Sequence, residues 1–300
     1  MKIGRYAPDE WVKDHPTGNI AFQHLLKGDP DAPDNFMYIL GRQDADFYMP
    51  RHRHNFDQIR LPIVGPMNHG DGIVLGEGQV GYLAEGLAYG PQEDPLGNAK
   101  PGERLQFVLQ FGGASGIGFM SIEERRKARE ELEKVGRFEE NLYRHADGKA
   151  EWGLNTIWEH VYKAKLKYPK SRYRTPVIAD PKNFNWLRMT DAAGVDHKFM
   201  GSFSERGVWV EMIRLQPGSS WMSIDARARR LLVVLSGSGK AGAEKVGLYD
   251  AVQADPRDQL SLTSEEGMEL FLVGLPPIEA PAHGADSHDL AELPTAVGAL

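Results

Sequence analysis

Two histidines one residue apart, followed by a glutamine, are the strongest candidates for chemistry in this chain. His52, His54 and Gln58 have the same parity in a segment with strand character. Alternate side chains of a strand point to the same face. Imidazole nitrogens and an amide oxygen suit iron, manganese, nickel or zinc. The pattern predicts a metal site, with Gln58 standing where a carboxylate would bind more strongly.

Short apolar segments, separated by Gly and Pro turns, must position this motif. We expect strands at 36–40, 59–64, 78–83 and 105–109, and again at 208–213, 230–235 and 270–273. Many short strands at this spacing favour an all-β fold, an antiparallel sandwich or barrel.

A helical section separates the two groups of strands. Ser121 and Glu124 form the pattern of a capping box, which predicts a helix over 123–135 that Gly136 ends. Apolar residues at helical spacing predict a second helix near 155–166. We therefore divide the chain into an N-terminal arm or strand-edge segment without core elements (1–34), a first β domain (35–118), a helical connector (119–175), a second β domain (176–278) and a flexible tail (279–300).

Composition excludes several classes of function. The chain has no cysteine, which excludes disulfides and thiol catalysis, and its net charge of −7 disfavours nucleic acid as a partner. The basic residues clustered at 163–174 are explained by a solvated helix end or linker, with a binding patch as the alternative. No apolar run suits a signal peptide or a membrane span, so we expect a cytoplasmic protein without a membrane partner.

The histidine motif belongs to a longer frame of spacings that resembles the two motifs of the cupin superfamily. The first family motif is Gly, five residues, His-x-His, three or four residues, Glu, six residues, Gly. Its positions fall here on Asp46, His52, His54, Gln58 and Gly65. The second motif is Gly, five residues, Pro-x-Gly, two residues, His, three residues, Asn. Its positions fall on Gly78, Ala84, Gly86, Tyr89 and Glu93.

The second β domain repeats the frame without its chemistry. The positions of the first motif fall on Gly218, Ile224, Ala226, Arg230 and Gly237, and those of the second on Asp250, Pro256, Asp258 and Ser261. From about residue 35 to 275 the chain thus resembles a bicupin. The resemblance implies two antiparallel cupin barrels (double-stranded β-helices) joined by the helical connector, the second without its metal ligands.

By this resemblance, His52, His54, Gln58 and Tyr89 converge in the first barrel as the metal ligands. As a phenolate, Tyr89 would restore the negative charge that Gln58 lacks, because a bound metal lowers the pKa of its ligands. Hard oxygen favours iron, with manganese, nickel or zinc as alternatives. Two other interpretations stay open: Tyr89 lies beside the metal without binding it, or the histidines are polar lining that binds water.

Strand parity and loop composition predict where the charged and imidazole side chains near the motif lie. Asp57 has the opposite parity and should point away from the histidines, and His69 lies in a Gly-rich loop where we expect a surface residue. Arg60 shares the parity of Gln58, so we expect it in the interior. There it either holds a substrate carboxylate or forms a structural ion pair.

Four further residues are candidates for lining the pocket. Gln106 and Gln110 alternate on one face of a predicted strand, and Tyr82 and Phe56 are expected to form apolar walls.

The function that follows is an enzyme with one metal ion, acting on a small organic molecule. We favour a dioxygenase-like oxidoreductase in which Tyr89 and Arg60 are the catalytic candidates, because a tyrosinate and two histidines suit iron. The alternatives are a metal-dependent isomerase or lyase, and a non-catalytic bicupin that binds a small molecule. A DNA-binding regulator is disfavoured, since the sequence contains no clear helix-turn-helix. A homodimer is expected, because exposed barrel edges commonly pair.

Overall fold

Two large antiparallel β-sheets form the body of the molecule. The computed structural model describes residues 1–13, 20–30, 32, 34–44, 47–93, 104–117, 119–139 and 141–278. The tail predicted at 279–300 and Asp46 lie outside the described residues. Within these ranges, the sheet of the first barrel contains β14 (Val177–Ala179), β8 (Val80–Leu83), β5 (Asp57–Val64), β10 (Arg104–Phe111), β3 (Phe36–Gln43) and β2 (Ile20–Lys27), in that order.

The large sheet of the second barrel is also antiparallel. Its described strands, in order, are β1 (Lys2–Gly4), β22 (Ala251–Ala254), β19 (Arg229–Gly237), β24 (Met268–Leu275), β17 (Trp209–Leu215), β16 (Val195–Ser202) and β15 (Leu187–Arg188). A smaller sheet faces it, formed by β18 (Ser219–Ile224), β23 (Gln259–Ser264), β20 (Gly239–Ala241) and β21 (Glu244–Val246). The seven predicted strands are confirmed, with small differences at their ends.

Short strand pairs complete the first barrel around the histidine motif. These are β4 (His52–Arg53) with β9 (Ala88–Tyr89), and β6 (Met67–Asn68) with β7 (Val74–Leu75). The chain leaves β4 after Arg53, bends, and enters β5 at Asp57. One continuous strand through the motif was therefore a wrong expectation, and His54 lies in the bend.

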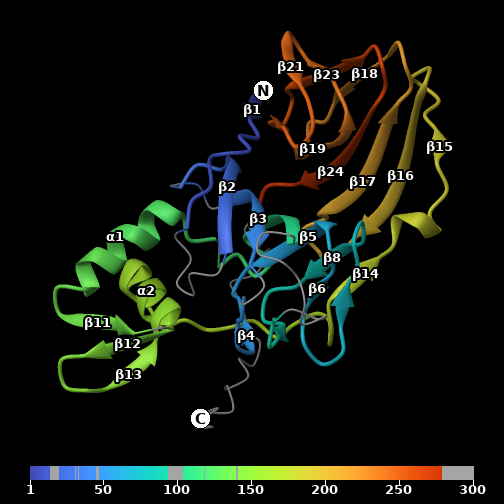
Figure 1. Ribbon diagram of the computed structural model, residues 1–300. Coiled ribbons are helices and arrows are strands. Elements are labelled where there is room, and N and C mark those ends of the chain that lie inside the picture. Colours follow the sequence, from blue (N-terminus) through green and yellow to red (C-terminus); the bar gives the residue numbers. More distant parts are fainter. Residues whose placement is uncertain are drawn as a thin grey trace.

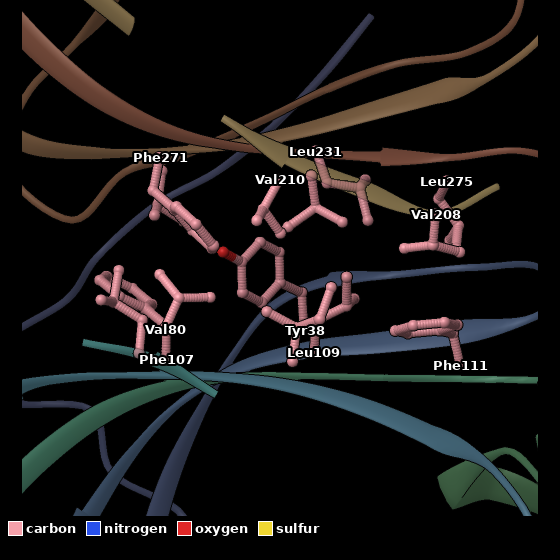
Figure 2. Packing of buried hydrophobic residues seen from close by; sticks show 14 of the residues in the cluster. Tyr38, Val80, Phe107, Leu109, Phe111, Val208, Val210, Leu231, Phe271 and Leu275 are labelled. Atoms are coloured by element: carbon pink, nitrogen blue, oxygen red, sulfur yellow. The ribbon is translucent and has the colours of Figure 1, made fainter. Parts of the chain in front are cut away.

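The two large sheets pack face to face through a single apolar core. Figure 2 shows Val210, Leu231 and Phe271 on one side of this core, and Tyr38 and Phe107 on the other. Every second residue of each strand belongs to this core, so the residues between them point into the interior of the barrel to which the strand belongs. In the second barrel that interior is apolar, filled by a cluster that includes Trp221, Leu232 and Leu262.

The N-terminal segment belongs to both sheets. Strand β2 pairs with β3 and buries Leu25 and Leu26 in the shared core, so the expectation of an arm without core elements is wrong for this strand. Strand β1 pairs with β22 of the second barrel, and β14 in turn pairs with β8 of the first. Each large sheet therefore includes a strand from the other part of the sequence.

The helical connector lies to one side of the barrels (Figure 1). Helix α1 (Ile122–Leu132) begins at the predicted capping box, in which Ser121 accepts from the Glu124 amide and Glu124 accepts from that of Ser121. Helix α2 (Gly153–Tyr162) is also confirmed, and both pack on a small sheet of β11 (Gly136–Glu139), β12 (Leu142–His145) and β13 (Ala150–Trp152). A short 3-10 helix (Pro181–Asn183) follows β14. In the described part of the chain, no helix is long and apolar enough to cross a membrane.

One arginine of the basic cluster at 163–174 anchors the connector to the first barrel. Arg172 donates to the buried Glu85 at 2.7 Å and lies 3.8 Å from the buried Asp57. Burial, and then the neighbouring Glu85, raise the pKa of Asp57 to about 6, while Arg172 opposes the shift. For Arg172 this ion pairing supports the linker interpretation of the cluster over a binding patch.

We predict that Leu231→Ala lowers the free energy of unfolding by about 2–5 kcal/mol, because it opens a cavity in the core that joins the sheets. The matched control is Leu187→Ala, whose side chain is 60% exposed and which should cost less than about 0.5 kcal/mol. Chemical denaturation measures both values. Equal losses in the two variants would contradict the shared core.

Arg172→Met should destabilise the protein by about 3–5 kcal/mol, because it leaves two buried carboxylates without their cation. The loss should be larger at pH 7 than at pH 4. Without Arg172, the pKa of Asp57, which burial already raises, rises further in the folded state, so the native protein binds more protons than the unfolded chain and its stability falls as the pH rises. Lys170→Met, an exposed lysine of the same segment, is the control, and a similar loss there would refute the ion-pair account.

Candidate metal centre

Tyr89 is the centre of a buried polar cluster inside the first barrel. Its side chain is only 3% exposed, and the pairing of β4 with β9 places it opposite His52. The Tyr89 hydroxyl lies 3.1 Å from His54 Nε2, 3.1 Å from Gln58 Nε2 and 2.9 Å from an Arg60 terminal nitrogen. The structure thus brings together all the residues predicted as metal ligands and the predicted interior arginine.

The directions of these hydrogen bonds follow from their donors. The amide nitrogen of Gln58 and the Arg60 guanidinium can only donate, so the Tyr89 oxygen accepts from both and its own proton is directed to His54 Nε2. Burial raises the pKa of Tyr89, although the charge of Arg60 and the hydrogen bond from Gln58 oppose the shift. Tyr89 is therefore a neutral phenol. The hydrogen bonds that its oxygen accepts from Gln58 and Arg60 would stabilise a negative charge on that oxygen.

His52 has the orientation of a potential metal ligand. Its Nδ1 lies 2.8 Å from the Pro50 carbonyl oxygen, so Nδ1 donates and Nε2 keeps its lone pair. Burial, together with the nearby charge of Arg60, lowers the pKa of His52 to about 4 despite the opposing bond to Pro50. The ring is neutral at physiological pH, which is the form that binds a metal.

His69 is part of the site, contrary to the expectation of a surface loop residue. It is 1% exposed, and its ring centroid lies 5.6 Å from that of Tyr89. The Gly90 amide donates to the His69 carbonyl, which fixes the loop beside β9. Burial lowers the pKa of His69 well below its ordinary value, and its Nε2 has no hydrogen-bond partner. The parity of His69 with the buried Met67 was the sequence signal that could have found it.

Gln58 and Arg60 bind each other within the barrel. Arg60 donates to Gln58 Oε1 through Nε at 3.1 Å and through a terminal nitrogen at 2.7 Å. The interior position predicted for Arg60 is confirmed, and no carboxylate of the described residues forms the alternative ion pair with it. The oxygens of both Gln58 and Tyr89 therefore already accept hydrogen bonds from Arg60.

The opposite parity predicted for Asp57 is confirmed. Asp57 points to the other face of β5, where it accepts from Tyr82 Oη at 2.8 Å and the Glu85 amide at 2.7 Å. Tyr82 consequently belongs to the core between the sheets and stacks on Phe203, so its assignment to the pocket wall is wrong.

Two pocket-lining predictions have direct support. The Phe56 ring lies 4.5 Å from that of His54, centroid to centroid. The register of β10 with β5 places Gln110 opposite Gln58, and Gln106 has the same parity. Gln106 is buried, and its Oε1 has no hydrogen-bond partner.

The equivalent positions of the second barrel hold no comparable cluster. Ile224 is 64% exposed and Ala226 is also exposed, so neither points to the interior. Arg230 is buried and donates to the Ser223 and Asp258 carbonyls at 2.8 and 2.6 Å. There, a guanidinium cross-links the backbone of the smaller sheet.

Among the described residues, no three His, Asp or Glu side chains form a group that could hold a metal ion. A site at His52 and His54 would therefore take an oxygen from another type of side chain. Tyr89 supplies that oxygen, and the unpartnered Nε2 of His69 is a further donor atom nearby.

Comparisons with known proteins agree with this architecture. No family model matches the chain, and no curated protein matches it in sequence. Among solved structures, HEPD of Streptomyces albus, described with 2-hydroxyethylphosphonate and Fe(II), is 12% identical with a TM-score of 0.54, covering 91% of this chain and 74% of that one. YhhW of Escherichia coli is 13% identical with a TM-score of 0.51, covering 93% and 99%, and was also solved as a bacterial pirin with nickel(II). Together with the two antiparallel barrels, these likenesses show that the chain has the bicupin fold.

Proposed function

We propose that the first barrel is the metal centre of an enzyme that acts on a small organic molecule, and that this enzyme is a dioxygenase-like oxidoreductase. The observation that carries the proposal is the convergence of His52, His54 and Tyr89 in one buried cluster. Two proteins of the same fold are described with Fe(II) and with nickel(II), which supports a divalent transition metal. We favour iron, with manganese, nickel or zinc as alternatives.

In this proposal each residue has a separate role. His52 and His54 hold the metal, and Gln58 acts through the hydrogen bonds that fix Tyr89 and Arg60 or as a weak ligand. When bound, the metal supplies a Lewis-acid and redox-active centre for the substrate. Tyr89 either contributes its oxygen to the metal or moves a proton along its hydrogen bond to His54. Arg60 stabilises negative charge on the Tyr89 oxygen.

A non-catalytic bicupin that binds a small molecule is the second candidate. It is favoured by the two hydrogen bonds from Arg60 to Gln58 Oε1, the atom that a metal would otherwise need from this side chain. In that function the polar cluster would recognise a ligand directly.

Elemental analysis separates the two candidates. Protein purified without chelator should contain close to one transition-metal ion per chain, and His52→Ala/His54→Ala should lower that content at least about tenfold, since even losing a residue that only orients a ligand costs about that much. His145→Ala/His160→Ala, which removes two imidazoles of the helical connector, is the control and should keep the metal. Negligible metal in the wild type, or equal metal in all three proteins, would exclude the enzyme proposed here.

Tyr89→Phe should keep the fold but lower the free energy of unfolding of metal-free protein by about 1–3 kcal/mol, because buried donors of Gln58 and Arg60 lose their shared acceptor. Tyr48→Phe, at an exposed tyrosine, is the control and should change stability by less than about 0.5 kcal/mol. Denaturant titration measures both. An unchanged stability in Tyr89→Phe would show that the hydroxyl does not organise the site.

A further inference from the structure

Arg60 is a buried cation without an anionic partner. Its side chain is 7% exposed, and the groups that accept its hydrogen bonds are the neutral Gln58 amide and Tyr89 hydroxyl. Buried charges in proteins are normally paired, because an isolated charge is costly to remove from water. The described residues supply no carboxylate for this guanidinium, so its charge is uncompensated.

The neighbouring charges do not neutralise it. Asp57 and Glu85 are the buried carboxylates near this strand, and both are engaged with Arg172 on the opposite face of β5. Among the described residues, no carboxylate therefore lies on the face of β5 that carries Arg60.

Hydrogen bonds hold the Arg60 guanidinium in place and leave one terminal nitrogen without a partner among the described residues. Nε and one terminal nitrogen bind Gln58 and Tyr89, and the carbon of the guanidinium lies 5.3 Å from the centroid of the Tyr89 ring. The other terminal nitrogen, NH1, has no hydrogen-bond partner among the described residues. An anion that reached NH1 would meet a donor whose orientation is already fixed.

A second unsatisfied group has the same parity on the adjacent strand. Val108 is the register partner of Arg60, and Gln106, two residues along β10, has the same parity. Gln106 is buried and its Oε1 accepts no hydrogen bond. A buried acceptor left unpaired costs free energy, which a ligand that carries a donor would recover.

We propose that the first barrel binds a small organic anion, with its carboxylate or phosphonate on Arg60 and a hydroxyl or amino group on Gln106. The inference rests on the proposed function in taking this barrel as the substrate site, and it names the class of substrate. It can be tested on metal-free protein, because Arg60 and Gln106 are not among the residues proposed to hold the metal.

The test is a titration of chelator-treated full-length protein at constant ionic strength, followed by calorimetry and by thermal unfolding. The probes are glycolate, hydroxymethylphosphonate and uncharged ethylene glycol. At least one anion should bind saturably and raise the unfolding temperature, while ethylene glycol should do neither. The preferred anion distinguishes a carboxylate site from a phosphonate site. Saturation by neither anion, or equal binding of ethylene glycol, would overturn the proposal.

Variants identify the residues. Arg60→Gln should weaken anion binding at least about tenfold, as expected for the loss of charged hydrogen bonds, whereas Arg51→Gln, at an exposed neighbouring arginine, should change it less than about twofold. Equal affinities in these two variants would contradict the role of Arg60.

Two further variants keep the test decisive if Arg60→Gln fails to fold. Arg60→Lys keeps the charge but loses the planar fork, and should bind with intermediate affinity. Gln106→Leu should weaken glycolate several-fold but leave acetate, which lacks the hydroxyl, unchanged. Unaltered glycolate binding in both variants would contradict the inference. Because all titrations use metal-free protein, a failure of metal binding would leave these results intact.

Discussion

The apolar core between the two large sheets is the constraint on which the rest of the structure depends. In β5, Ile59 and Leu61 belong to this core. Because side chains alternate along a strand, Gln58 and Arg60 then point into the first barrel. A shift of one residue in this strand would move the carboxylate of Asp57 into the barrel and Arg60 into the core. Packing between the barrels therefore determines which charge the site contains.

The two barrels use a buried arginine in different ways. In the second, Arg230 binds backbone carbonyls in an otherwise apolar interior, and its hydrogen bonds serve the fold. In the first, Arg60 binds the side chains of Gln58 and Tyr89, and part of its guanidinium stays open. An arginine thus links parts of the backbone in the second barrel, whereas in the first barrel it has no anionic partner among the described residues.

Much of this arrangement could be predicted from sequence because it follows periodicity and spacing. The strands, the capping box at Ser121 and the opposite face for Asp57 are local consequences of side-chain alternation or of backbone hydrogen bonding. His69 and Tyr82 could not be placed in this way. The environment of each depends on a contact distant in sequence: the loop of His69 on β9, and the stacking of Tyr82 on Phe203 of the second barrel.

The most direct test of the account is anomalous diffraction at the iron absorption edge from crystals grown with Fe(II) in the absence of oxygen. The account predicts one strong peak inside the first barrel, between the His52 and His54 imidazoles and the Tyr89 oxygen, and none in the second barrel. A peak at the half-exposed His145 and Glu151 pair alone, or no peak at full iron concentration, would contradict a metal centre at Tyr89.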